Sequence, residues 1–189
     1  MEPGTQGPDE RRLKRLEEAL LVTEAQAGDS DAFVQLMNRY SKPLLYYLRR
    51  LVPEADSLDI HQEVWIDAFR GLSSLQVPEA FRVWIYQIAR HKAARFIRNE
   101  VIEKTAVGSL AEEQEQVADT FDATETEAVH RALQVLPQHQ REILVLHYLR
   151  DLSTDEIAAV LDCPRGTVKS RLFHARFALR QVMERKAHE

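Results

Sequence analysis

Apolar residues recur every three or four positions along most of this chain, which is the spacing of one face of an α-helix. No stretch alternates between apolar and polar residues as a half-buried β-strand does. The spacing predicts helices that begin after Asp29, after Ser57 and after Pro78, the third of them reaching about Asn99. Asp29 is a favourable N-cap, and Pro43 should kink or break the first helix. The residues expected in the core are Phe33, Leu36, Met37, Tyr40, Leu44, Leu48, Ile60, Val64, Ala68, Phe69, Phe81, Ile85, Ile88, Ala89 and Phe96.

A second group of apolar positions fills the C-terminal third of the chain. Pro137 separates a short helix from the next one, and Ser153 with Glu156 forms an S-x-x-E capping box directly before a new apolar pattern. A helix is therefore predicted to begin at Ser153 and to end near Asp162, and Pro164 suits the first position of a last helix. Its buried line is expected to be Val168, Leu172, Ala175, Leu179 and Val182. Two helices joined by a tight turn predict a helix-turn-helix.

The segments outside these patterns divide the chain. Residues 1–20 mix Pro, Gly and charge, and we predict a disordered or frayed tail there that is not part of the core. Residues 101–126 carry weak periodicity and repeated acidic residues against the lone base Lys104, so a flexible, self-repelling linker is expected. The prediction is an all-α protein of two small helical domains, residues 21–100 and 127–189, which move independently.

Composition narrows the class of protein. The chain has 189 residues, and the 44% that are hydrophobic are enough to form real cores. No apolar run approaches the roughly 20 residues that a membrane span needs, and Met1 to Asp9 lacks the features of a signal peptide. We therefore expect a cytoplasmic protein without membrane insertion. The single cysteine, Cys163, can form neither an internal disulfide nor a cysteine cluster for zinc.

Catalytic and metal-binding motifs are missing from the sequence. His61 lies two positions from Glu63, but no H-E-x-x-H pattern or second nearby ligand follows, and the other histidines lack ligand spacing. No glycine-rich phosphate loop and no nucleophile motif is found. We expect no catalytic residues, no metal site and no cofactor, and hence no enzyme.

Charge is distributed unevenly along the chain. The net charge is -5, yet the segment from Arg165 to Lys186 is almost purely basic, and DNA responds to local patches rather than to an average. If the apolar line of the last helix faces the core, its basic and polar residues project outward near the N-terminal half. A helix with donors there suits the major groove of DNA, where Phe173 could contact a thymine methyl. An ordinary amphipathic helix with a solvated basic face is the alternative.

Motifs of the C-terminal segment resemble the extracytoplasmic-function sigma factors. Leu136-Pro137 is followed by Gln-Arg-Glu at 140–142, residues 151–158 read Asp-Leu-Ser-Thr-Asp-Glu-Ile-Ala, and residues 166–172 read Gly-Thr-Val-Lys-Ser-Arg-Leu. In that family this domain, sigma region 4, reads the minus-thirty-five promoter element. The resemblance implies contacts with that element for Arg165, Thr167, Lys169, Ser170, Arg171, Phe173, His174 and Arg176.

The first domain carries a second motif. Residues 59–65 read Asp-Ile-His-Gln-Glu-Val-Trp and resemble the D-x-x-Q-E-V-aromatic stretch of the same family. On a helix, Asp59, Gln62 and Glu63 share one face, which complements basic residues. The resemblance implies that this domain is sigma region 2 and that the three residues bind the β′ coiled coil of RNA polymerase core. A merely solvated polar face is the alternative.

The third predicted helix resembles the F-x-x-W-L-Y-x-I-A-x-N stretch, which in this family melts and holds the minus-ten element. Aromatic rings beside basic residues are what single-stranded DNA binding needs, although Phe81 and Trp84 can equally be core residues. The family usually has Asn where His91 stands and an acid where Arg95 stands, so its base preference is not transferred. The residues expected to contact minus-ten DNA are Trp84, Tyr86, Arg90, His91, Lys92, Arg95 and Arg98.

The resemblance covers roughly residues 25–181 and implies a sigma factor that directs promoter recognition and transcription initiation. The implied partners are RNA polymerase core, through its β′ coiled coil and its β subunit, promoter DNA and an anti-sigma factor. One alternative is a helix-turn-helix regulator that does not bind polymerase and dimerises through its first domain. Another is an interaction protein without DNA function, against which the outward Lys169, Ser170 and Arg171 argue.

Overall fold

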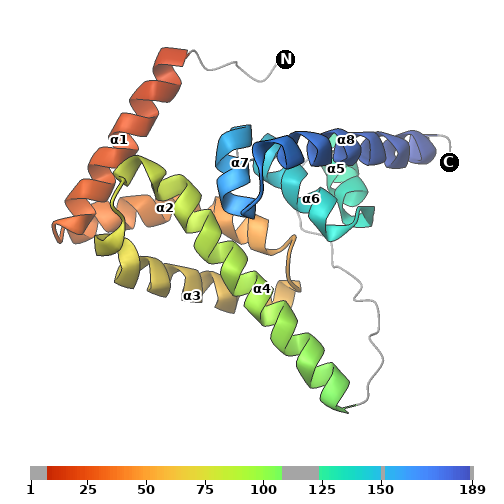
Figure 1. Cartoon of the computed structure of the whole chain (residues 1–189), viewed down its shortest axis with the longest axis horizontal. Helices are drawn as coiled ribbons and strands as arrows, with labels where there is room; N and C mark the ends of the chain where they lie inside the picture. The colour runs from red at the N-terminus through yellow and green to blue at the C-terminus, as the bar shows by residue number, and fades with distance from the viewer. Residues whose placement is uncertain (1–7, 108–123, 150–151, 188–189) are drawn as a thin grey trace.

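The protein is helical in every regular element that the structure describes (Figure 1). The computed structural model describes residues 8–107, 124–149 and 152–187. The first domain contains α1 (Pro8–Gln26), α2 (Ser30–Leu48), α3 (Glu54–Gly71), the short turns η1 (Leu72–Ser74) and η2 (Pro78–Ala80), and α4 (Phe81–Val107). The second contains α5 (Thr124–Val135), α6 (Gln138–Leu144), the π-helical turn η3 (Val145–Leu149), α7 (Thr154–Leu161) and α8 (Arg165–Ala187). The all-α expectation is confirmed. None of the described helices has the length and apolar character that crossing a membrane requires.

Helix α2 begins at the capping residue that the sequence predicts. The Asp29 carboxylate accepts hydrogen bonds from the backbone amides of Asp31 and Ala32, which satisfies donors that have no partner inside the helix. The helix then continues through Pro43 to Leu48, so the proline does not break it. Buried residues on both sides of the proline outweigh the loss of one backbone hydrogen bond.

Helix α1 belongs to the first domain, contrary to the expectation of a frayed tail outside the core. Ala19 and Val22 are 8% and 0% exposed, and α1 packs on α2. The Glu18 carboxylate accepts a hydrogen bond from the Tyr40 hydroxyl, and burial together with this carboxylate raises the pKa of Tyr40. The helix is docked by small apolar residues, by this hydrogen bond and by those from Gln26 Nε2 to the carbonyl oxygens of Leu72 and Leu75, a signal too sparse for periodicity to reveal. Residues 1–7 lie outside the described part of the chain.

Two expectations about α3 and α4 need correction. Phe69 was expected on the buried face of α3, but it is 68% exposed. The inward face is already filled by residues such as Val64 and Ala68, which are both 0% exposed. Helix α4 runs to Val107 rather than to about Asn99. It therefore continues into the segment that was expected to be a linker.

The second domain confirms the predicted helix-turn-helix. Pro137 is the N-cap of α6 and separates it from α5. At the start of α7 the Ser153 hydroxyl accepts a hydrogen bond from the amide of Glu156, whose carboxylate accepts one from the amide of Ser153. Asp162, with a φ of 50°, ends α7 in the left-handed conformation and turns the chain into α8. The predicted buried line of α8 is observed for Val168, Leu172 and Ala175, while Leu179 and Val182 are half-buried.

The two domains pack against each other in this conformation, and α4 lies against α7 (Figure 1). One cluster of buried side chains runs from the first domain into the second. The sequence had favoured domains that move independently about a linker over residues 101–126. Of that segment, residues 101–107 are helical and residues 108–123 lie outside the described residues.

Candidate functional site

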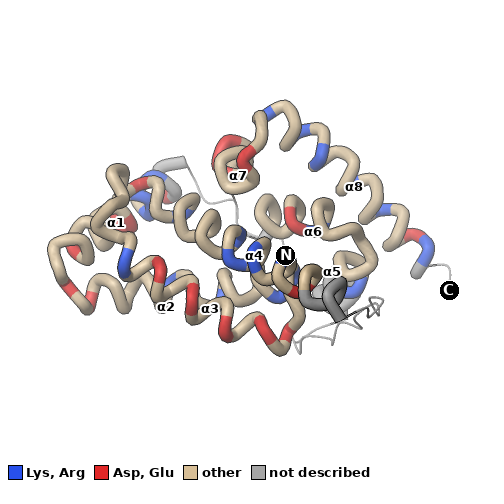
Figure 2. The backbone as a smooth tube through the Cα atoms, turned by 60° about the horizontal axis from the view of Figure 1, so that its bottom comes forward, with Lys and Arg blue, Asp and Glu red and all other residues tan. Residues whose placement is uncertain are grey.

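Helix α3 presents the three residues of the expected docking face to solvent. Asp59, Gln62 and Glu63 are all exposed, whereas Ile60 and Val64 are buried in the core. This rotation places two carboxylates and an amide on the outer surface, and acidic positions recur along α3 in Figure 2. Such a face can bind basic side chains of a partner.

Exposed apolar side chains lie beside this acidic face, a feature that the sequence analysis missed. Leu58, Ile66 and Phe69 are 51%, 47% and 68% exposed. At 100° per residue they fall on the same side of α3 as Gln62. An apolar centre bordered by polar groups is typical of protein interfaces. The signal was available in the sequence, because these residues do not fit the line of buried positions in α3.

Lys92, expected to contact DNA, is bonded to the acidic face instead. Its Nζ lies 3.1 Å from Glu63 Oε2 and 2.9 Å from Asp67 Oδ2. The side chain is only 18% exposed, and hydrogen bonding, chiefly to Asp67, raises the pKa of Lys92. Lys92 therefore connects α4 to α3 and holds the Glu63 side chain in place.

The aromatic residues of α4 lie mostly in the core. Phe81 and Tyr86 are 0% and 1% exposed, and Tyr86 packs edge to face on Tyr47 with ring centroids 5.3 Å apart. Trp84 is half-buried beside Gly71, where an added Cβ would lie 3.2 Å from the indole. Of the two aromatic residues expected to stack on bases, only Trp84 has an exposed part in this conformation.

Other expected minus-ten residues of α4 project into solvent. His91, Arg95 and Arg98 are exposed, and the two arginines are neighbours on one helix face because they lie three positions apart. Arg90 differs, because its Nε donates a hydrogen bond to Glu142 of the second domain at 3.2 Å. The exposed part of the expected DNA surface is therefore the middle and C-terminal part of α4.

The N-terminal half of α8 carries the polar face expected for minus-thirty-five contacts. Lys169, Ser170, Arg171, Phe173 and His174 are all exposed, and Phe173 reaches 69%. Basic positions recur along this helix in Figure 2. The face is thus available to a DNA groove in the conformation described.

Neighbouring positions modify this face. Arg165 Nε lies 3.1 Å from Asp155 Oδ1, and Thr167 is half-buried, so both are less available than expected. Phe177 is 61% exposed one turn beyond Phe173 and extends the exposed surface. Sequence reasoning missed Phe177 because it followed only the buried line and the family motif.

Arg176 is held beside η3. Its Nη2 lies 3.1 Å from His147 Nε2, and its guanidinium lies over the Tyr148 ring, 5.3 Å from the centroid. His147 Nδ1 lies 3.4 Å from the carbonyl oxygen of Leu152, so a proton on Nδ1 leaves Nε2 as the acceptor. A DNA phosphate would have to compete with these partners for Arg176.

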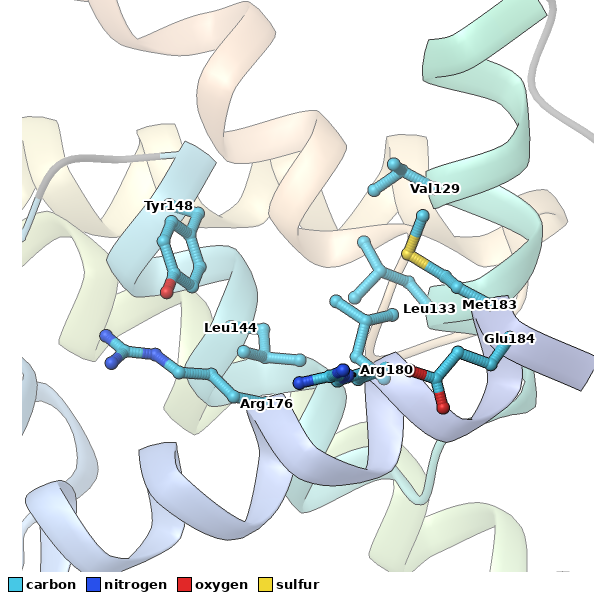
Figure 3. A pocket seen from close by; sticks show the side chains of 9 residues that line it. Val129, Leu133, Leu144, Tyr148, Arg176, Arg180, Met183 and Glu184 are labelled. Atoms are coloured by element: carbon cyan, nitrogen blue, oxygen red, sulfur yellow. Dashed lines mark hydrogen bonds and ion pairs between the residues drawn. The ribbon is translucent and has the colours of Figure 1, made fainter.

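An apolar groove of about 490 Å³ lies between α5, α6 and α8 (Figure 3). Arg180 and Glu184, one turn apart on α8, form an ion pair of 2.7 Å at its edge. Such a groove can receive the apolar face of a helix. The lining residues are Val129, Leu133, Leu144, Tyr148, Arg176, Leu179, Arg180, Met183 and Glu184.

The histidines and the cysteine show no arrangement for metal chemistry. In the described ranges, no three His, Cys, Asp or Glu residues gather where they could hold a metal ion. His61 accepts a hydrogen bond from Trp65 Nε1 at Nε2, over 3.1 Å, and burial lowers the pKa of His61. Cys163 is a free, half-buried thiol. His61 thus has a structural role in the packing of α3.

Family models match both domains. Residues 36–101 match Sigma-70 region 2, and residues 126–179 match Sigma-70, region 4. The chain is 34% identical over 179 residues to the ECF RNA polymerase sigma-E factor of Escherichia coli K12, an alignment that covers 88% of this chain and 94% of that protein. It is 32% identical over 190 residues to the RNA polymerase sigma-H factor of Pseudomonas aeruginosa PAO1, covering 91% and 96%.

Solved structures are similar over most of the chain. CnrH in complex with the cytosolic domain of CnrY has 26% identity and a TM-score of 0.65, with 88% of this chain and 97% of that chain covered. RpoE in complex with the anti-sigma factor NepR from Bartonella quintana shares the fold at 22% identity, with a TM-score of 0.71 over 80% and 96% of the two chains. Because a relative above 30% identity covers nearly the whole chain and both domains match in order, this protein belongs to the extracytoplasmic-function sigma factors of bacterial RNA polymerase.

Proposed function

We propose that this sigma factor distributes polymerase binding and promoter recognition over separate surfaces of its two domains. As a member of its family, the chain binds bacterial RNA polymerase core and directs promoter recognition and transcription initiation. We assign core docking and the minus-ten element to residues 21–100, and the minus-thirty-five element to residues 127–189. The observation that carries this assignment is one chain with an exposed acidic helix, α3, and an exposed basic recognition helix, α8.

Docking on the polymerase β′ coiled coil is assigned to Asp59, Gln62 and Glu63. Their exposure supports the assignment, and so does the ion pair between Lys92 and Glu63, because a side chain that is already ordered loses less entropy on binding. The exposed Leu58, next to Asp59, supplies apolar area that an acidic patch alone lacks.

Minus-thirty-five recognition is assigned to the outward residues at the start of α8. Lys169 and Phe173 lie one turn apart and are placed to reach base edges, while Arg171 on the flank is placed to reach phosphate. Their exposure supports these roles. Arg176 is the weakest member of the expected set, because His147 and Tyr148 hold its guanidinium.

Minus-ten binding is assigned to α4, but to fewer residues than the sequence suggested. Trp84, His91, Arg95 and Arg98 remain as candidates, because each has exposed surface. Lys92 is bonded to two carboxylates. We therefore remove Lys92 from the DNA contacts and assign it to the support of the docking face.

The apolar groove of the second domain is our candidate for a contact with the polymerase β subunit. The groove has a mostly apolar lining, and Arg176 and Arg180 lie at its edge. This chemistry fits an amphipathic helix that carries acidic residues beside its apolar face. Met183 lines the groove and is 41% exposed, so changing it to Lys should weaken core binding without changing affinity for minus-thirty-five DNA.

The remaining roles rest on the family. We propose that the chain is not an enzyme and that the polymerase performs the chemistry. We propose that the protein acts in the cytoplasm, where polymerase and DNA are found. CnrH and the Bartonella RpoE were solved with CnrY and an anti-sigma factor, and we propose that this chain also has an anti-sigma partner.

Run-off transcription with polymerase core on a promoter library tests the proposed function. A sigma factor should make core initiate at a shared pair of promoter elements, and core alone should not. A helix-turn-helix regulator that does not bind polymerase is the competing function. The relatives do not favour a regulator. A pull-down in which core fails to bind the chain would contradict the sigma-factor function and leave the regulator as the alternative.

A further inference from the structure

Helix α1 carries a second apolar face, on the side turned away from the first domain. Ala19 and Val22 of this helix are buried in the domain, whereas Leu13, Leu16 and Leu20 are 57%, 54% and 59% exposed. At 100° per residue, Leu20 lies about 160° around the helix from Val22. A helix that is apolar on two sides has one side left to bury against another surface.

The three leucines follow the spacing of a coiled coil. Leu13 and Leu16 are three positions apart and Leu16 and Leu20 are four apart, so they occupy positions a, d and a of a heptad repeat. Single leucines scattered over a surface are ordinary. Leucines at this spacing instead form a continuous line, whose side chains can insert between those of a neighbouring helix.

Glutamates border the leucine line on one side. Glu10, Glu17 and Glu24 are all exposed, and they lie seven positions apart, at the e positions of the same heptads. This border would meet the headgroups of an anionic membrane and be repelled by them. Glu10 is paired with Lys14 within the helix, at 3.1 Å. The face therefore suits a helix that offers an apolar line and a basic residue opposite Glu17.

A second copy of this chain supplies that basic residue. In a parallel pair of helices, a residue at position g of one helix meets the residue at the following e position of the other. Arg12 occupies such a g position and Glu17 the following e position. Both side chains are exposed, and within the described ranges neither of them forms an ion pair. Each copy would thus offer Arg12 to Glu17 of the other.

Charge and shape both favour the parallel orientation. An antiparallel pair would bring the e positions of the two helices together, and glutamates there would repel each other. The domain is attached to the side of α1 opposite the leucines, so the rest of each copy lies outside the pair. Arg15, which reaches Glu156 of α7 at 3.5 Å, lies on this outer side as well, because it is seven positions from Val22.

We propose that α1 is a self-association surface, on which two copies of this protein pair Leu13, Leu16 and Leu20 in a short parallel coiled coil. Three leucines per helix bury less than a standard interface does, so the pair is transient and forms at high protein concentration. Helix α1 packs on α2, η1 and η2, and the exposed acidic face of α3 takes no part. The inference is independent of the roles proposed for α3, α4 and α8.

Sedimentation equilibrium of the full chain tests the proposal. Between about 10 μM and about 1 mM, the weight-average mass should rise from that of one chain toward that of two. Leu16→Glu should keep the mass of one chain at every concentration. Leu58→Glu is the matched control, because Leu58 is 51% exposed on α3, and it should associate as the wild type does. Circular dichroism should show native helicity for both variants.

Two outcomes of this measurement would overturn the proposal. One is a wild-type chain that stays single over the whole concentration range, which would leave the leucine face to a different protein. The other is association that is lost in Leu58→Glu and kept in Leu16→Glu, which would place the contact on α3.

A charge exchange between copies tests the register of the pair. Arg12→Glu alone opposes two carboxylates, and Glu17→Arg alone opposes two guanidinium groups. Each variant should therefore need about a tenfold higher concentration than the wild type to associate. An equimolar mixture of the two variants should associate at the wild-type concentration, because opposite charges then meet in both pairs. Single variants that associate as readily as the wild type would contradict the parallel pairing of Arg12 with Glu17.

Discussion

The ammonium group of Lys92 lies 3.1 Å from the carboxylate of Glu63, so a residue of α4, the helix assigned to minus-ten DNA, supports α3, the helix assigned to polymerase docking. The same ammonium reaches Asp67 at 2.9 Å. Glu63 and Asp67 lie four positions apart on α3, where two carboxylates without a cation would repel each other. Lys92 therefore links α4 to α3 within the region 2 domain.

Replacing Lys92 by Met should lower stability and leave DNA binding unchanged. The two carboxylates are 60% and 43% exposed, so solvent screening limits the loss in unfolding free energy to about 1 kcal/mol. Arg98→Met is the matched comparison, because Arg98 is exposed on the same helix. It should weaken binding to single-stranded DNA without affecting stability. Urea unfolding measures the stability of both variants, and titration with single-stranded DNA measures their affinity. If Lys92→Met lowered DNA affinity and left stability unchanged, Lys92 would be a minus-ten contact.

Changing Glu63 to Lys should weaken association with polymerase core. The substitution reverses one charge of the docking face and places a second ammonium beside Lys92, so we expect about a tenfold loss of affinity with native helicity. Glu17→Lys, at an exposed position on α1, makes the same charge change away from this face and should have little effect. Equal affinities of both variants in a binding titration would show that α3 does not dock on core.

Changing Phe173 to Ala should narrow the difference in affinity between the preferred minus-thirty-five element and a scrambled duplex. A good base contact contributes about 1 to 3 kcal/mol of discrimination. Arg176→Ala should leave this difference intact, because the guanidinium lies against His147 and Tyr148. Titrations of both variants on both duplexes test the assignment. Unchanged discrimination by Phe173→Ala would mean that this side chain contacts no base.

Changing Ser153 to Ala should destabilise the helix-turn-helix. The hydroxyl caps α7 by accepting a hydrogen bond from the amide of Glu156 at 3.2 Å, and loss of such a cap costs about 1 kcal/mol. Ser170→Ala is the control, because its hydroxyl bonds a carbonyl within α8 at an exposed position and caps no helix. The midpoint of thermal unfolding should be lower for Ser153→Ala than for Ser170→Ala. Equal midpoints would show that the capping box does not stabilise the protein.

Acidification should destabilise the first domain through His61. Burial lowers the pKa of His61, and the neutral ring accepts the hydrogen bond from Trp65. A group whose pKa is lower in the folded state contributes stability above its unfolded value of about 6.5 and loses it as the pH falls through the folded value. His61→Gln keeps an acceptor but does not titrate. Its unfolding free energy should vary less between neutral and mildly acidic pH than that of the wild type.

Local rules predicted the helices well, because their determinants are adjacent in sequence. The Asp29 cap and the Ser153–Glu156 capping box are formed by residues two or three positions apart. The exposed face of α8 could be predicted in the same way, because the apolar positions Val168 and Leu172 fix which side of the helix is buried. Periodicity and capping chemistry were sufficient for these features.

Contacts between distant segments could not be predicted in this way. The Arg90–Glu142 ion pair joins residues 52 positions apart, and no pattern within either helix distinguishes an interdomain cation from one that binds phosphate. The ion pairs of Lys92 with Glu63 and Asp67 could not be predicted for the same reason. Phe69 was expected on the same buried face as Val64 and Ala68, although its rotation on α3 leaves it 68% exposed.

Helix α8 carries two of the surfaces to which we assign a function, and it does so without a break. It has 23 residues and is about 35 Å long. Lys169 and Phe173 lie in its first half, and Leu179 and Met183 line the groove in its second half. An uninterrupted helix transmits rotation from one end to the other. A partner that occupies the groove would therefore fix the angle at which the first half enters DNA, and the helix itself would set the geometry between polymerase and the upstream promoter element.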